Sequence, residues 1–150
     1  MTLQEANNFF ENLKTATTKK SEIKVYEKFL HILNRLEIRE FSKDEIQSIE
    51  TELDNLNLKS NPENKKKYYN KALSDFKKYL KDTFSLTPKG YYTNLYGALG
   101  LSFGVLFGVA ILSNLERSLG ISLGLIGGMV VGSIMGRNKD AQAKAAGKML

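Results

Sequence analysis

The sequence predicts an all-α protein in which a small helical domain of about four helices precedes a two-helix transmembrane hairpin. Residues 1–89 are densely charged and carry apolar residues at helical spacing. From Gly90 to Gly136, by contrast, Glu116 and Arg117 are the only charged residues. Glycine recurs at every fourth position within this apolar part. We therefore expect a cytosolic helical domain over residues 1–86.

The first helix of that domain is expected to begin at a capping box. In TLQEANNFFENLK, the Thr2 hydroxyl can accept from the backbone N–H of Glu5, whose carboxylate can reach back to Thr2. Three apolar residues follow at helical spacing and are expected to be buried: Phe9, Phe10 and Leu13.

The second and third helices are also predicted from caps and apolar stripes. Ser21 is a candidate N-cap for the second helix, which is the best core candidate. Its stripes consist of Ile23, Tyr26, Leu30 and Leu33, with Val25, Phe29, Ile32 and Leu36 beside them. A second capping box, Ser42 to Glu45, begins a helix with the narrower stripe Ile46, Ile49, Leu53 and Leu56.

The fourth helix is expected to carry an apolar face and a basic face. Pro62 suits its first turn, and its buried stripe is predicted to be Tyr69, Leu73, Phe76 and Leu80. The opposite face is rich in lysine, and we expect anionic lipid headgroups beside Lys77, Lys78 and Lys81. A solvated lysine face is the simpler alternative, and we do not expect nucleic acid as a partner, because no nucleic-acid motif surrounds the lysines.

Two uncharged stretches are long enough to cross a bilayer. The 19 residues from Ser118 to Gly136 would reach about 28 Å as a helix, close to the hydrocarbon thickness of about 30 Å. The other stretch runs from Gly90 to Leu115. We expect a hairpin over residues 87–137 with spans at about 91–114 and 118–136, followed by a basic cytosolic tail over residues 138–150. Thr87 can cap the first span and Pro88 can begin it.

The glycine spacing is typical of close helix packing in membranes. Glycine costs about 0.5–1 kcal/mol relative to alanine in a soluble helix, so a regular row of glycines calls for a packing reason. Residues four apart form a ridge on which another backbone can pack closely. The two rows either pack on each other inside one hairpin, or one packs inside and the other between protomers, which we favour. The rows are Gly100, Gly104 and Gly108, and Gly120, Gly124, Gly128, Gly132 and Gly136.

The flanking residues predict the orientation of the hairpin. Basic residues gather before the first span and after the second, including Lys89 and Arg137, so both termini are expected in the cytoplasm. Tyr91, Tyr92 and Tyr96 lie where an aromatic belt at the membrane interface belongs. The amino-terminal residues lack the features of a secretory signal, so the first span is expected to direct insertion.

No catalytic, cofactor-binding or metal-binding residue is expected. GLSFG and GISLG match the pattern of a nucleophile elbow, but both lie in apolar helices and His31 is the only histidine. The chain has no cysteine, which removes thiolate metal sites and lipid attachment to cysteine. We expect a non-enzymatic protein.

The block YGALGLSFGVLFGVAILSNLERSLGISLGLIGGMVVGSIMG and the charged tail that follows resemble the bacterial glycine-zipper family of two-helix membrane proteins. The resemblance covers roughly the last third of the chain and implies helix packing through the glycines of both rows. The chain lacks the lipobox cysteine of lipoprotein members, so we expect a bacterial cytoplasmic membrane. No family resemblance is found for the amino-terminal helices.

Two classes of function follow. In the first, which we favour, the protein oligomerises through its glycine helices and forms a pore or perturbs the bilayer under control of the helical domain. In the second, the hairpin is an anchor and the cytosolic helices recruit a partner protein. A structural subunit of a membrane complex is a further alternative.

Overall fold

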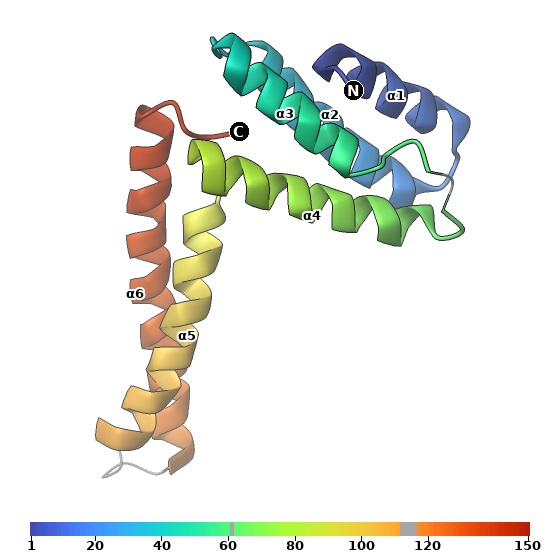
Figure 1. The fold of residues 1–150 in the computed structure, drawn as a ribbon. Coiled ribbons are helices and arrows are strands. Elements are labelled where there is room, and N and C mark those ends of the chain that lie inside the picture. The colour runs from blue at the N-terminus through green and yellow to red at the C-terminus, as the bar shows by residue number, and fades with distance from the viewer. Residues whose placement is uncertain (61, 112–116) are drawn as a thin grey trace. The chain divides into compact units, whose positions relative to one another are not determined.

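The computed structural model describes residues 1–60, 62–111 and 117–150, and it confirms the all-α fold. Within these residues the chain forms six helices and no strand (Figure 1). The helices are α1 (Leu3–Ala16), α2 (Lys20–Glu37), α3 (Lys43–Asn55), α4 (Lys65–Phe84), α5 (Tyr91–Ile111) and α6 (Arg117–Ala145). The predicted end of the first span at about residue 114, and Glu116 in the predicted connection, lie outside the described residues.

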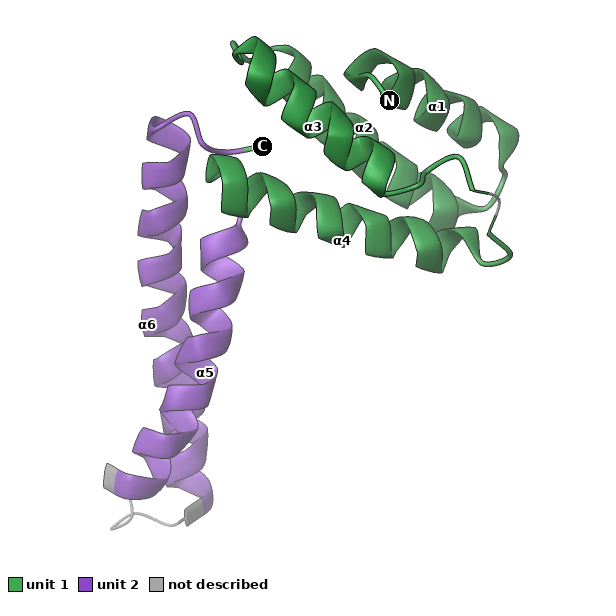
Figure 2. Cartoon of the chain, viewed as in Figure 1, with its two compact units in different colours: residues 1–86, 150 green, residues 87–149 purple. Residues whose placement is uncertain are grey.

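The chain divides into two compact units, drawn in different colours in Figure 2. The first, which we call the helical domain, consists of Met1–Leu86 together with Leu150. The second, which we call the hairpin, consists of Thr87–Met149. The helical domain contains α1 to α4, and the hairpin contains α5 and α6.

Both predicted capping boxes are present. The Glu5 N–H donates to Thr2 Oγ1 at 3.1 Å, and the Thr2 N–H donates to the Glu5 carboxylate at 3.0 Å. At the start of α3, the Glu45 N–H donates to Ser42 Oγ at 3.3 Å, and the Ser42 N–H donates back at 2.8 Å. Hydrogen bonding to Ser42 lowers the pKa of the Glu45 carboxyl. Each box satisfies backbone donors that the helix itself leaves without partners.

The predicted starts of α2 and α4 are wrong. Ser21 lies inside α2, because the Lys19 carbonyl already accepts from the Ile23 N–H at 3.1 Å and no side chain caps the helix. Pro62 lies before α4 rather than in its first turn. The Asn64 side chain accepts from the Lys67 N–H at 3.0 Å and begins the helix there, since asparagine is a strong N-cap.

The predicted N-cap of α5 at Thr87, with Pro88 as its first residue, is also wrong. Thr87 does not cap the helix, because its backbone forms an isolated bridge with Met149 and its N–H donates to the Lys148 carbonyl at 2.9 Å. The chain then turns through Gly90, whose φ of +77° lies in the left-handed region that glycine adopts without strain. Helix α5 therefore begins at Tyr91.

The core of the helical domain is built on aromatic rings. Phe10 of α1 stacks on Phe29 of α2 with ring centroids 4.2 Å apart, and Tyr69 of α4 meets Tyr26 edge to face at 5.4 Å. Burying each large apolar side chain stabilises the fold by about 1.5–3 kcal/mol. The predicted stripes of α2 and α4 are buried except at Ile23, which is half-buried. The other predicted core residues that are only half-buried are Phe9, Leu13, Ile46 and Leu56.

Tyr69 also carries the main buried hydrogen bond of this core. Its hydroxyl donates to the Leu58 carbonyl at 3.0 Å, and its side chain is only 1% exposed. Burial raises the pKa of Tyr69 to about 12, and the neighbouring Tyr26 and Tyr68 add to the effect. The phenol is thus held in its neutral form.

Helix α6 runs to Ala145, well beyond the predicted span end at Gly136. The residues after Gly136 are mainly good helix formers, so nothing ends the helix at the limit of the apolar stretch. Gly147, with φ of +67°, ends it in a Schellman motif. In that motif the Lys148 N–H donates to the Ala143 carbonyl at 2.8 Å. Most of the predicted tail is therefore a continuation of α6.

We predict that Tyr69→Phe removes one step from the alkaline titration of the protein. A raised pKa means that the contribution of Tyr69 to stability is present below pH 10 and is lost as the pH rises from 10 to about 12. The variant should lose the tyrosinate absorbance step near pH 12, and its stability should fall less over this interval. The lost hydrogen bond should cost about 1 kcal/mol at neutral pH. An unchanged titration near pH 12 would contradict the assignment.

Candidate functional site

The two hairpin helices lie side by side and run antiparallel (Figure 1). Gly100 meets Gly128, whereas Gly108, further along α5, meets Gly120, earlier in α6. This order of contacts requires opposite chain directions. Both helices are long and apolar enough to cross a membrane. The hairpin is the candidate functional site because its packing departs most from that of a soluble domain.

The glycine rows face each other across this interface. A Cβ atom added to Gly100, Gly104 or Gly108 would lie closer than 3.0 Å to a backbone carbonyl of α6, a distance that real Cβ atoms do not show. The obstructing carbonyls belong to Gly128, Gly124 and Gly120 respectively. Near the other end of the interface, Gly132 meets the Tyr96 carbonyl and Gly136 meets the backbone of Thr93. The backbones can approach this closely only because side chains are absent.

Of the two arrangements left open by the sequence, the structure has the one that we did not favour, in which the rows pack on each other. All the glycines of both rows lie in the one interface between α5 and α6. Gly127 is different, because a Cβ atom there would meet nothing within 4 Å. Gly97 lies about one turn before Gly100, and a Cβ atom there would meet only Ser133 Oγ, at 3.7 Å.

The large apolar side chains of the hairpin point outward. In both candidate spans, only 17% of the most apolar window is buried. The exposed fractions of Leu106, Ile126 and Val131 are 64%, 63% and 58%. An apolar surface of this extent is rare on a soluble monomer and is typical of a surface covered by lipid or by another protein. Small residues therefore lie inside and large apolar residues outside.

A carboxylate from α6 caps the start of α5. Asp140 accepts from the backbone N–H groups of Tyr92 and Thr93, each at 3.0 Å, and from Thr93 Oγ1 at 2.6 Å. The side chain is 9% exposed and satisfies donors that the first turn of a helix otherwise leaves open. Sequence reasoning missed this residue, since an Asp in a basic tail gives no sign of a partner so far away in the chain.

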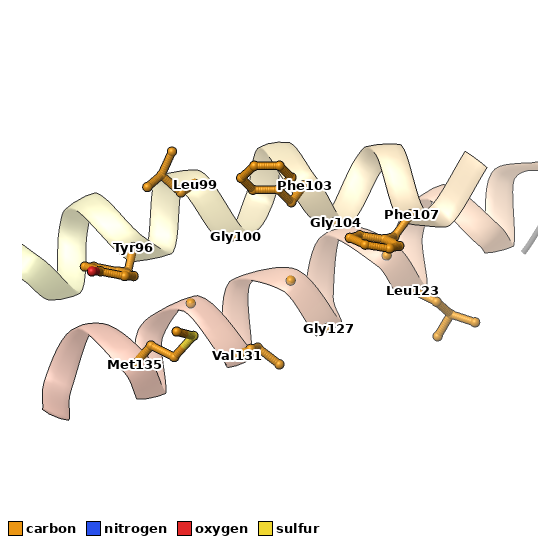
Figure 3. A pocket seen from close by; sticks show the side chains of 13 residues that line it. Tyr96, Leu99, Gly100, Phe103, Gly104, Phe107, Leu123, Gly127, Val131 and Met135 are labelled. Atoms are coloured by element: carbon orange, nitrogen blue, oxygen red, sulfur yellow. The ribbon is translucent and has the colours of Figure 1, made fainter. Parts of the chain in front are cut away.

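One side of the hairpin is hollowed into an apolar groove of ≈ 530 Å³ (Figure 3). Large side chains of α5, including Leu99, Phe103 and Phe107, form one wall. Val131 and Met135 of α6 belong to the other wall, and glycines of both helices line the rest of the groove. The lining contains no acid, base or nucleophile besides the Tyr96 hydroxyl. Its chemistry suits hydrocarbon rather than a polar substrate.

The predicted interface residues gather at one end of the hairpin. Tyr91, Tyr92 and Tyr96 follow one another around the start of α5, and the first two rings meet edge to face at 5.2 Å. Gly136 meets the backbone of Thr93, so the exposed Arg137 belongs to the same end. Lys89 precedes α5 and is exposed. Basic and aromatic groups thus lie together there.

The three lysines expected beside lipid headgroups differ in their surroundings. Lys78 is exposed. Lys77 is half-buried, and burial together with the charge of Lys28 lowers the pKa of its ammonium group. Lys81 forms an ion pair with Asp82 at 3.1 Å. Of the three, Lys78 offers the most accessible charge.

Residues 1–60, 62–111 and 117–150 contain no group of three or more His, Asp or Glu side chains placed to hold a metal ion. His31 is exposed on α2.

Comparisons with protein-family models, with curated proteins and with solved structures gave no match.

We predict opposite outcomes for alanine at two adjacent glycines. Gly128→Ala places a methyl group against the Gly100 carbonyl and should separate the helices at a cost of about 1–3 kcal/mol. Gly127→Ala is the matched control, because its methyl group meets nothing within 4 Å. Helix separation can be measured as a slower formation of a disulfide between cysteines introduced by Gly97→Cys and Ser133→Cys. Equal rates in the two variants would contradict the observed packing.

Proposed function

We propose that this chain is a non-enzymatic integral membrane protein whose glycine-zipper hairpin crosses a bacterial cytoplasmic membrane. The observation that carries the proposal is the distribution of side chains in the hairpin, with glycine inside and large apolar residues outside. In water this distribution would expose a large apolar surface, whereas in a bilayer the same surface is solvated by lipid.

A soluble helical pair is the main alternative, and the burial of the helices weighs against it. The core helices of a soluble protein are mostly buried, whereas α5 and α6 bury only 17% of their most apolar windows. The spans also begin at residue 91, far from the place of a cleaved signal sequence. The basic residues near both outer ends of the hairpin support a cytoplasmic location for the helical domain and for the end of α6.

Membrane anchoring is the activity that the geometry supports best. Both glycine rows are used inside the hairpin, so neither row is left to join protomers. The hydroxyls of Ser102 and Ser122 donate to carbonyls of their own helices, at 3.1 Å and 2.8 Å, and leave little polar surface for a water-filled lumen. In this proposal, the helical domain has its own core and recruits a cytosolic protein or joins a larger membrane complex.

A membrane-perturbing oligomer is the second candidate, and the groove favours it. The groove is concave and apolar, and Gly127 lies open in its lining. Side chains of a second hairpin could fill it, so that copies associate through the groove rather than through the glycine rows. Assembled copies would then disturb the bilayer under control of the helical domain.

Release of a trapped dye from anionic liposomes separates the two candidates. The wild-type protein is compared with Gly127→Leu, which fills the groove, and with Gly128→Leu, which obstructs the hairpin itself. If the hairpin is an anchor, the vesicles should retain their dye with all three proteins. Protease protection verifies that each protein has inserted. The oligomer predicts release by the wild type and loss of release with Gly127→Leu. Release that persists in Gly127→Leu would rule out association through the groove.

A further inference from the structure

The glycine rows by themselves fit together in more than one register. In the structure, Gly100 of α5 lies between Gly128 and Gly132 of α6, and Gly104 lies between Gly124 and Gly128. Because α6 carries five glycines in its row, a shift of α6 by four residues would bring glycine against glycine again. Gly100 would then lie between Gly132 and Gly136. Backbone packing therefore distinguishes poorly between two arrangements that differ by four residues, about one helical turn or about 6 Å along the helix.

Within the helices, the contacts of Asp140 do distinguish between them, whereas the hydrogen bond from the Thr87 N–H to the Lys148 carbonyl lies beyond the ends of α5 and α6. In the observed register its carboxylate meets three donors at the first turn of α5, on Tyr92 and Thr93. After a shift of one turn, the carboxylate would lie beside Tyr96 and Gly97 instead. Backbone N–H groups at that position already donate within the helix, so the charge would lose its partners. A charged group without partners is costly to bury.

We propose that Asp140 is the positioning residue that selects the register of the hairpin, and that α6 shifts one turn along α5 when its carboxylate is removed. The proposal goes beyond the proposed function and does not depend on whether the protein anchors or permeabilises. The contact consists of the Asp140 carboxylate and its donors on Tyr92 and Thr93. Thr93 contributes two of the three donors.

Two cysteine pairs report the two registers, and the chain has no cysteine of its own. The observed register is reported by Gly97→Cys with Ser133→Cys, since a Cβ atom at 97 lies 3.7 Å from Ser133 Oγ, within the reach of a disulfide. The shifted register is reported by Leu101→Cys with Ser133→Cys, because position 101 lies one turn further along α5. Each pair is introduced into the full chain, which is held in lipid nanodiscs and oxidised with copper phenanthroline.

With Asp140 present, we expect the 97–133 disulfide and little of the 101–133 disulfide. With Asp140→Ala, the ratio of the two should move toward 101–133 by about tenfold or more, since several charge-assisted hydrogen bonds are lost. Thr93→Val removes only the hydroxyl donor and should move the ratio less. Lys139→Ala, at the exposed neighbouring position, is the matched control and should leave the ratio unchanged.

Three results would overturn the proposal. If Asp140→Ala still forms the 97–133 disulfide alone, other contacts select the register. If the variant forms neither disulfide, Asp140 is required for the hairpin to form at all rather than for the choice between registers. Equal shifts in Asp140→Ala and Lys139→Ala would show that the ratio responds to any change in this part of α6, which also contradicts the proposal.

Discussion

The close approach of two backbones is the constraint on which the rest of the hairpin depends. Lipid surrounds apolar side chains as readily as a protein core does, so helices in a bilayer gain little from simply burying leucine. They gain from dispersion contacts between close backbones, and weak Cα–H···O contacts accompany such close approaches. The facing glycines of α5 and α6 make this approach possible, and they leave the large side chains only the outer surface.

The helical domain is stabilised in a different way from the hairpin. Its core packs aromatic rings from α1, α2 and α4 together with aliphatic side chains, including those of α3. The helical domain is thus stabilised by removing apolar surface from water, whereas the hairpin buries little apolar surface and packs through close backbones. This difference supports the proposal that the two units meet different solvents.

Features with nearby partners in the chain could be predicted from the sequence, and features with distant partners could not. The capping boxes at Thr2 and Ser42 were predictable because each closes within three residues. The cap on α5 was not, since Asp140 lies 47 residues from Thr93. The starts assigned to Ser21 and Pro62 failed for another reason: both residues suit a helix start, but a neighbouring group satisfies the first turn instead. For the site, the spacing predicted which glycines pack, while the identity of the opposing surface required the tertiary structure.

An interface made of glycine has a thermodynamic consequence. Closing it immobilises no side chain at the points of closest contact, so the entropy lost there is confined to the backbone, which the helices have already ordered. In the proposed bilayer location, opening the hairpin would change the exposure of little apolar surface to water, so the heat-capacity change of opening should be small. The stability of the helical domain, with its aromatic core, should curve strongly with temperature, whereas that of the hairpin should vary almost linearly. Cooling would thus affect the two units of the chain differently.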